Sequence, residues 1–167
     1  VEDTDKGDET RLWYPPTIEG ESAYFLSANR NKRDIALNLK SPEGLELFYK
    51  LVANSDIVLE NFRPGVAEKL GIGYERVAKF RPSIIYCSIS GFGQNGPYKD
   101  FSGYDLIVFA MGGLMNFTGA PGGEPVRLGV PIADMSAGLY AASAILAALR
   151  FRDVTGKGQY VDVSMYD

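Results

Sequence analysis

The sequence predicts an α/β fold, a Rossmann-like parallel sheet with flanking helices. Apolar runs of strand length alternate along the chain with segments whose apolar residues recur at helical spacing. Residues 57–59 form a continuous apolar run bounded by acids, as in strands covered on both faces, and residues 84–89 form a second, largely apolar run. Strand, helix and strand at this spacing indicate a parallel α/β sheet.

The first third of the chain is expected to hold two strand segments and one helix. Residues 1–2 have the character of the end of a strand, and residues 34–39 alternate as a half-buried strand. A helix should run over residues 42–54, because Ser41 is a capping residue and proline suits the first helical position. Its apolar residues fall on one face and should pack on the sheet: Leu47, Phe48, Leu51 and Val52.

The remaining chain should consist of helices, glycine-rich loops and two strands. Their expected order is helices 66–70 and 74–80, strand 83–89, loop 91–103, helix 104–115, loop 119–131, helix 135–149 and strand 159–164. Asp105 is expected as a cap or first-turn acid of the helix after the first loop.

Bulk composition excludes several functional classes. With 167 residues and 46% hydrophobic content the chain is one domain or most of one, and its net charge of −4 with scattered cations argues against nucleic-acid binding. No signal peptide and no uncharged apolar stretch of about 20 residues is found, so no membrane span is expected. The single cysteine, Cys87, excludes an internal disulfide framework and fits a cytoplasmic protein. The absence of histidine excludes Ser-His-Asp catalysis and His-ligated zinc, and no metal site is expected.

Asp134 is the only acid between Glu124 and Asp153, and it stands where a Gly/Pro-rich loop gives way to an alanine-rich helix. It is either a helix cap or a nucleophile. A cap would accept backbone N–H groups at the helix start, and the positive end of the helix dipole would keep the carboxylate ionised. Covalent catalysis by aspartate needs the same ionised state, so local pattern leaves both roles open.

A cluster of cations is predicted at one edge of the sheet. Asn61, Phe62 and Arg63 follow a strand and precede a helix, a position where open α/β sheets bind ligands and free N–H groups meet anions. Lys40 and Lys69 could add charge and favour a phosphorylated ligand, although a simple turn with solvated cations is the alternative.

The glycine-rich loop at residues 91–96 matches G-x-G-x-x-G, the pattern of dinucleotide-binding loops. Pro97 follows at once, and no acid lies about 20 residues further on to bind a ribose. A nicotinamide or flavin site is therefore rejected in favour of a ligand-facing or mobile loop.

Taken together, six segments resemble the family III CoA-transferases, the CaiB/BaiF family: residues 31–40, 58–65, 90–98, 103–106, 132–140 and 155–164. The resemblance covers almost the whole chain. It implies that residues 1–167 are a single piece of the family's large Rossmann-like domain, truncated at both ends and without the small C-terminal domain. It also implies an interlocked homodimer for the complete protein.

The resemblance further implies that Asp134 is the catalytic carboxylate of a transferase. CoA would move between an acyl-CoA thioester and a free carboxylic acid through an aspartyl-acyl mixed anhydride, with coenzyme A as substrate and no tightly bound cofactor. Lys40 and Lys69 would face the CoA phosphates and Phe62 the adenine. The implied CoA contacts are Leu37, Asn38, Leu39, Lys40, Asn61, Phe62, Arg63, Lys69, Phe101, Ser102, Gly103 and Tyr104. Some members carry a cation near the position of Asp3 and a lysine near that of Ser102, which this chain lacks.

Two alternatives stand beside the transferase. The α-methylacyl-CoA racemases of the same family pair the aspartate with the histidine of a Gly-His-Asp motif, where this chain reads Gly103-Tyr104-Asp105. Since proton transfer on two faces of a carbon needs two groups, the missing histidine favours transfer. The other alternative is a CoA-binding α/β domain without activity, in which Asp134 is a cap.

Overall fold

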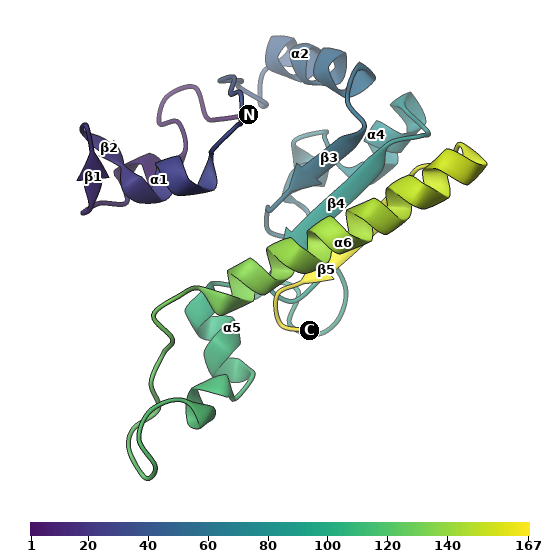
Figure 1. The fold of residues 1–167 in the computed structure, drawn as a ribbon. Coiled ribbons are helices and arrows are strands. Elements are labelled where there is room, and N and C mark those ends of the chain that lie inside the picture. The colour runs from purple at the N-terminus through teal and green to yellow at the C-terminus, as the bar shows by residue number, and fades with distance from the viewer. The chain divides into compact units, whose positions relative to one another are not determined.

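The computed structural model describes residues 1–167 and divides them into two compact units, residues 1–50 and 51–167. Figure 1 shows the order of their elements. The first unit contains η1 (Glu9–Leu12), β1 (Thr17–Ile18), β2 (Glu21–Ser22), α1 (Ala23–Ala28) and most of α2 (Pro42–Ala53). The second contains β3 (Ile57–Glu60), α3 (Val66–Lys69), α4 (Tyr74–Phe80), β4 (Ile85–Ser90), α5 (Asp105–Met111), η2 (Leu114–Phe117), α6 (Ile132–Thr155) and β5 (Gln159–Ser164).

The first unit is held by a cluster of charged side chains around Arg11. The Arg11 guanidinium donates to the Glu2 carboxylate at 2.8 Å and to Asp34 at 3.0 Å, and it lies 4.0 Å from the centre of the Phe25 ring. Arg11 lowers the Glu2 pKa to about 2, because the ionised carboxylate accepts its hydrogen bonds.

The second unit is built on a three-stranded parallel sheet with the order β3-β4-β5. The central strand β4 is continuously buried from Ile85 to Ser88. Burial also raises the pKa of the Cys87 thiol to about 11. The predicted parallel α/β sheet and the buried position of Cys87 are therefore confirmed.

Each face of this sheet is covered by different side chains. On one face, Ala137 and Ala141 of α6 pack against Cys87 and Val163, and small alanine side chains let the helix approach the strands closely. On the other face, Tyr74 of α4 contacts the rings of Tyr86 and Tyr160, with centroids 6.0 and 5.1 Å apart. The strands thus lie between α6 and α4, as Figure 1 shows.

Helix α6 is longer than β5, the strand that follows it. Its 24 residues span about 36 Å, whereas the six residues of β5 span about 20 Å. The turn at Gly156 reverses the chain, so the first turns of α6 extend toward the carboxyl edge of the sheet, where Figure 1 shows them beside α5. By length and composition alone α6 is also apolar enough to cross a membrane, a test that core helices pass as well.

The opposite end of α6 is tied to the amino end of β3. Arg152 in the last turn of α6 donates to the Asp56 carboxylate at 3.1 Å. Arg81, which follows α4, lies 3.8 Å from the same carboxylate and donates to the backbone of Val52 and Ala53. One aspartate therefore joins the ends of two helices at the amino edge of the sheet.

Four predictions about these elements were wrong in detail. Residues 34–39 form only an isolated parallel bridge, Ala36 to Glu2, rather than a full strand. Leu59 is 55% exposed because β3 is an edge strand, so residues 57–59 are not covered on both faces. The helix expected over residues 104–115 breaks at Gly112-Gly113, where Gly113 takes a positive φ of 73°.

The fourth correction concerns the face of α2. Phe48 and Val52 are buried as expected, whereas Leu47 and Leu51 are 44% and 42% exposed. The buried stripe instead passes through Gly44, Phe48 and Val52, four residues apart.

Candidate functional site

Two loops meet at the carboxyl edge of the sheet. The Asn61 side-chain amide donates to the Ile89 carbonyl of β4 at 2.8 Å, which ties the turn after β3 to the neighbouring strand. Beyond it, the Arg63 guanidinium donates to the Ser102 hydroxyl at 3.1 Å. The structure therefore brings together residues 61–63 and 101–104, two segments that the resemblance assigns to CoA.

A buried polar network lies beneath these loops. The Glu60 carboxylate accepts from the Phe62 backbone N–H at 2.7 Å, and the Gln94 side chain donates to the Ser88 hydroxyl at 2.7 Å. The Gln94 backbone N–H donates to Asp162 of β5 at 3.0 Å. Side chains from all three strands thus fix the first residues of both loops.

Desolvation raises the pKa of the Glu60 carboxyl, and its hydrogen bonds from Ser88 and the Phe62 N–H oppose that rise. Desolvation also raises the pKa of Tyr160, on the same face of the sheet, to about 12. Glu60 is buried and holds the loop after β3 through the Phe62 N–H.

Asp134 lies inside helix α6 rather than at its cap. Pro131 occupies the capping position without a side-chain hydrogen bond, and Asp134 is the third helical residue. The backbone donors at the helix start bind another carboxylate: Asp105 accepts from the N–H of Ala133 at 2.7 Å and of Asp134 at 3.3 Å. Of the two roles left open for Asp134, the helix cap does not fit, because Asp105 of α5 binds the donors at the helix start.

The electrostatic setting of Asp134 also differs from the expectation. A helix start should stabilise the ionised form, yet the pKa of Asp134 is raised, first by desolvation and then by the negative charge of Asp105. The Asp134 side chain is exposed on one side and has neither a hydrogen-bond donor nor a salt-bridge partner. Its two carboxylate oxygens are therefore free to react.

The other predicted residues lie in varied settings. In the first unit Leu37 is buried, and the Asn38 carboxamide accepts from the Lys40 backbone N–H at 3.0 Å in the turn before α2. Leu39 is half-buried and the Lys40 side chain is exposed.

In the second unit Lys69 is exposed at the end of α3, and no ion pair engages it. Phe101 belongs to an aromatic cluster with Tyr98 and Phe92, at centroid distances of 5.2 and 6.2 Å. Tyr104 is 69% exposed. Gly103 is packed so closely that an added Cβ would lie 2.0 Å from the Cα of Gly91.

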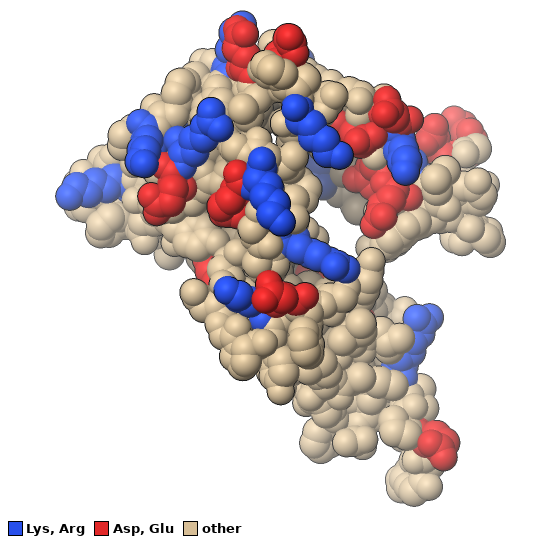
Figure 2. Space-filling model, turned by 180° about the vertical axis from the view of Figure 1, so that it is seen from behind, with Lys and Arg blue, Asp and Glu red and all other residues tan.

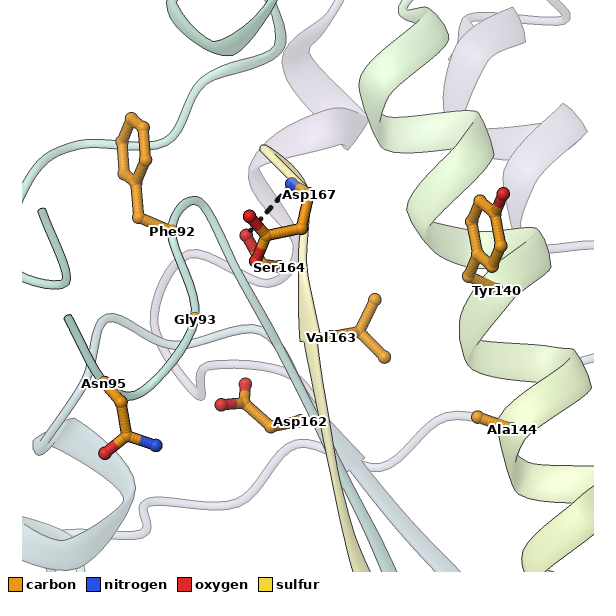
Figure 3. Close-up of a pocket in the computed structure, with 9 residues that line it drawn as sticks. All are labelled: Phe92, Gly93, Asn95, Tyr140, Ala144, Asp162, Val163, Ser164 and Asp167. Atoms are coloured by element: carbon orange, nitrogen blue, oxygen red, sulfur yellow. Dashed lines mark hydrogen bonds between the residues drawn. The ribbon is translucent and has the colours of Figure 1, made fainter. Parts of the chain in front are cut away.

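A cavity of about 480 Å³ opens beyond the end of β5. Figure 3 shows the glycine-rich loop on one side of β5 and α6 on the other. Its lining residues are Phe92, Gly93, Asn95, Tyr140, Ala144, Asp162, Val163, Ser164 and Asp167. Phe92, Gly93 and Asn95 belong to the loop that the sequence predicted to be ligand-facing or mobile. The cavity itself was not predicted, because it forms where three segments far apart along the chain meet.

The structure shows neither a large basic patch on the face in Figure 2 nor a cluster of metal-binding side chains. Figure 2 shows positive and negative side chains interspersed on the face it displays, without a large basic patch. No group of three or more Asp, Glu, Cys or His side chains could hold a metal ion.

Sequence reasoning missed the contact between Asp105 and α6 and the roles of Ser88 and Gln94. The separation of 28 positions between Asp105 and Ala133 hides the first contact from local pattern. A signal was present in Pro131, since a proline at a helix start offers no capping side chain and leaves the first donors to another group.

The chain is similar to known proteins over its whole length. The sequence model of CoA-transferase family III matches residues 1–167. A Mus musculus protein named succinyl-CoA:glutarate CoA-transferase is 48% identical over 165 residues, which are 99% of this chain and 38% of that protein. An Acetobacter aceti protein named acetyl-CoA:oxalate CoA-transferase is 45% identical over 168 residues, 100% of this chain and 43% of that protein.

Among solved structures, a CaiB/BaiF family protein from Brucella suis matches with a TM-score of 0.94 and 46% identity. The match covers 99% of this chain and 45% of that protein chain. The chain therefore spans about two fifths of the length of the relatives it matches.

Proposed function

Residues 1–167 belong to CoA-transferase family III, and we propose that the complete protein carrying them moves CoA from an acyl-CoA thioester to a free carboxylic acid, with Asp134 as nucleophile. In this proposal the chain is a piece of the large domain of a longer enzyme that works as an interlocked homodimer. Acyl-CoA and the acid are its substrates, and no tightly bound cofactor takes part.

The first step forms a mixed anhydride. A carboxylate oxygen of Asp134 attacks the thioester carbonyl carbon, the C–S bond breaks, and CoA leaves as thiolate with the electron pair. The thiolate then attacks the Asp134 carbonyl carbon of the anhydride, which releases the first acid and leaves an aspartyl-CoA thioester.

The second acid completes the exchange. Its carboxylate attacks the aspartyl-CoA thioester, giving a second aspartyl-acyl anhydride and free thiolate. Attack of that thiolate on the acyl carbonyl forms the new acyl-CoA and restores the Asp134 carboxylate. No proton needs to be transferred to carbon, so the sequence of steps requires no histidine.

The free carboxylate of Asp134 is the observation that carries this proposal. A structural cap would use its oxygens to bind backbone N–H groups, whereas those of Asp134 have no partner and Asp105 accepts from the helix start instead. A raised pKa makes the ionised carboxylate more basic and thus a stronger nucleophile.

The CoA site is proposed at the carboxyl edge of the sheet in the second unit. The contact between Arg63 and Ser102 supports it, because two separate segments of the proposed site meet there. In this proposal Arg63 and Lys69 face phosphate groups and Phe62, which is 37% exposed, lies beside the adenine ring. For the segment from Leu37 to Lys40, which belongs to the first unit, CoA contact rests on the family resemblance alone.

The acceptor is proposed to be a short dicarboxylic acid. The two transferases compared above are named for glutarate and oxalate, which both carry a second carboxylate. Assaying the complete protein against a panel of mono- and dicarboxylic acids, with succinyl-CoA and acetyl-CoA as donors, tests this specificity. A clear preference for monocarboxylic acids would contradict it.

Substitution of Asp134 tests the nucleophile. In the complete protein, Asp134→Ala and Asp134→Asn should each lower kcat for CoA exchange by at least about 10³-fold, because neither side chain can form the anhydride. Hydroxylamine added during turnover should convert Asp134 of the unmodified protein to a hydroxamate, detected by peptide mass spectrometry.

Asp153→Asn is the matched control, since Asp153 is an exposed acid on the same helix. It should exchange CoA at the unmodified rate. Full activity of Asp134→Ala, or a hydroxamate on another acidic residue, would contradict the proposed mechanism.

A further inference from the structure

We propose that Asp105 is a positioning residue for Asp134: it binds the backbone donors at the start of α6 and so keeps the Asp134 carboxylate unbound and aimed away from its own helix. This inference rests on the proposed role of Asp134 as nucleophile. It assigns a catalytic purpose to a contact between two helices that are separate in the sequence.

The geometry at the start of α6 carries the inference. The first N–H groups of a helix lack partners within it and bind the nearest acceptor. An acidic side chain in the first turn of a helix is itself attracted by these donors and by the positive end of the helix dipole. Asp134 holds that position, but the Asp105 Oδ1 atom already accepts from the N–H groups of Ala133 and Asp134.

Asp105 is held firmly enough for this task. It lies half-buried in the first turn of α5, where the backbone N–H groups of Ile107 and Val108 donate to the Tyr104 carbonyl at 2.9 and 3.1 Å. The next turn of α5 is anchored by Val108 and Phe109, each 4% exposed. The carboxylate therefore projects from a packed helix toward α6.

Asp105 is also the charged group that acts on Asp134. The loop before α6 contributes Glu124 and Arg127, and neither forms an ion pair with Asp134. Residues 135–149 of α6 carry no charge, and the strand residues packed on this helix, Cys87 and Val163, are uncharged at neutral pH. The anion of Asp105 raises the pKa of Asp134 by repulsion, in the same direction as desolvation.

The pKa of Asp134 sets the pH dependence of kcat/KM. Asp134 must be ionised to attack, so kcat/KM should fall as pH drops through the Asp134 pKa of the free enzyme. Removal of the Asp105 charge lowers that pKa and moves the acid limb of the profile to lower pH. It also makes the Asp134 carboxylate less basic, which should lower the plateau of kcat.

Two variants of the complete protein separate charge from hydrogen bonding. Asp105→Asn keeps an acceptor oxygen but loses the charge, so the acid limb should shift to lower pH while KM for acyl-CoA changes little. Asp105→Ala loses both, which frees the helix donors to bind Asp134, and kcat should fall by between about tenfold and 100-fold. Asp153→Asn removes a charge from the same helix at a distance and should leave the profile unchanged.

The outcomes distinguish the two proposals. If Asp134→Ala keeps full activity, the nucleophile assignment fails, whatever Asp105 variants do. If Asp134→Ala is inactive while Asp105→Ala keeps the unmodified kcat, the positioning role alone is overturned. If Asp105→Ala does not fold, the acid limb of Asp105→Asn decides, because an unshifted limb would show that Asp105 does not act on Asp134.

Discussion

Gly91 and Gly103 face each other across the base of the glycine-rich loop. An added Cβ on Gly91 would lie 2.2 Å from the Cα of Gly103, well inside van der Waals contact. The two glycines thus let the chain return to its starting point before α5 begins. This close approach positions Ser102 beside Arg63 and Asp105 beside α6.

Alanine at Gly103 should therefore open the loop. We expect Gly103→Ala to lower the free energy of unfolding by about 1–3 kcal/mol through overpacking, and to raise KM for acyl-CoA. Gly138→Ala is the matched change in open space within α6. It should raise the free energy of unfolding by up to about 1 kcal/mol through helix propensity. Urea unfolding of both variants measures this difference, and equal losses would contradict it.

The strands of the sheet differ sharply in how much they are enclosed. Strand β4 has a hydrogen-bonded neighbour on each side and a helix over each face, whereas β3 has a free edge. Their burial differs accordingly: Ile85 is fully buried and Leu59 is 55% exposed. The stability of the second unit should depend mainly on the central strand.

Truncation of one apolar side chain on each strand checks this dependence. Ile85→Ala should lower the free energy of unfolding by about 2–5 kcal/mol, because it removes buried methyl groups and leaves a cavity. Leu59→Ala should change it by no more than about 0.5 kcal/mol. Urea midpoints with unchanged m values report both effects. A large loss in Leu59→Ala would show that the edge of β3 is covered in solution.

At the scale of the whole molecule, the two units differ in what holds them. The second unit is stabilised by its enclosed sheet, while Arg11 joins Glu2 and Asp34 in the first. The single tryptophan, Trp13, also lies in the first unit, where its ring contacts Tyr24 at 4.9 Å. Trp13 fluorescence therefore reports on the first unit by itself.

Acid should weaken the first unit through Glu2. Its folded pKa is about 2, below the ordinary value of 4.5, so its contribution is present above pH 4.5 and is lost as pH falls toward 2. Glu2→Gln should lower the Trp13-detected melting temperature at pH 6 and reduce its further drop at pH 3. Glu9→Gln, which changes an exposed glutamate without an ion pair, should behave as the unmodified chain. Identical pH dependence in both variants would contradict the role of Glu2.

Local sequence signals predicted the elements that depend on local chemistry. The bounds of α4 and β5 match the prediction, and α2 begins at Pro42 because Ser41 accepts from the Gly44 N–H. The failures have a different origin. Leu59 is exposed because β3 is an edge strand, and strand order is a property of the whole sheet that periodicity in one segment does not contain.

In the candidate site, too, the sequence predicted local features but not contacts between distant segments. Asp134 could be singled out as a lone acid at a helix start, and the turn at Asn61 could be placed at the carboxyl edge of the sheet. The competition for the backbone N–H donors at the start of α6 could not be predicted, because Asp105, which binds them, belongs to a different helix. Desolvation and, second to it, the charge of Asp105 raise the pKa of Asp134, against the expected effect of the helix start.

Asp56 lies at the end of the sheet opposite to all of these groups. Its ties to Arg81 and Arg152 hold the amino ends of the strands, whereas the loops proposed to bind CoA leave from the carboxyl ends. Substitutions in those loops need not disturb the ties around Asp56. The loops can therefore change in sequence while the ties at the amino edge continue to hold the sheet.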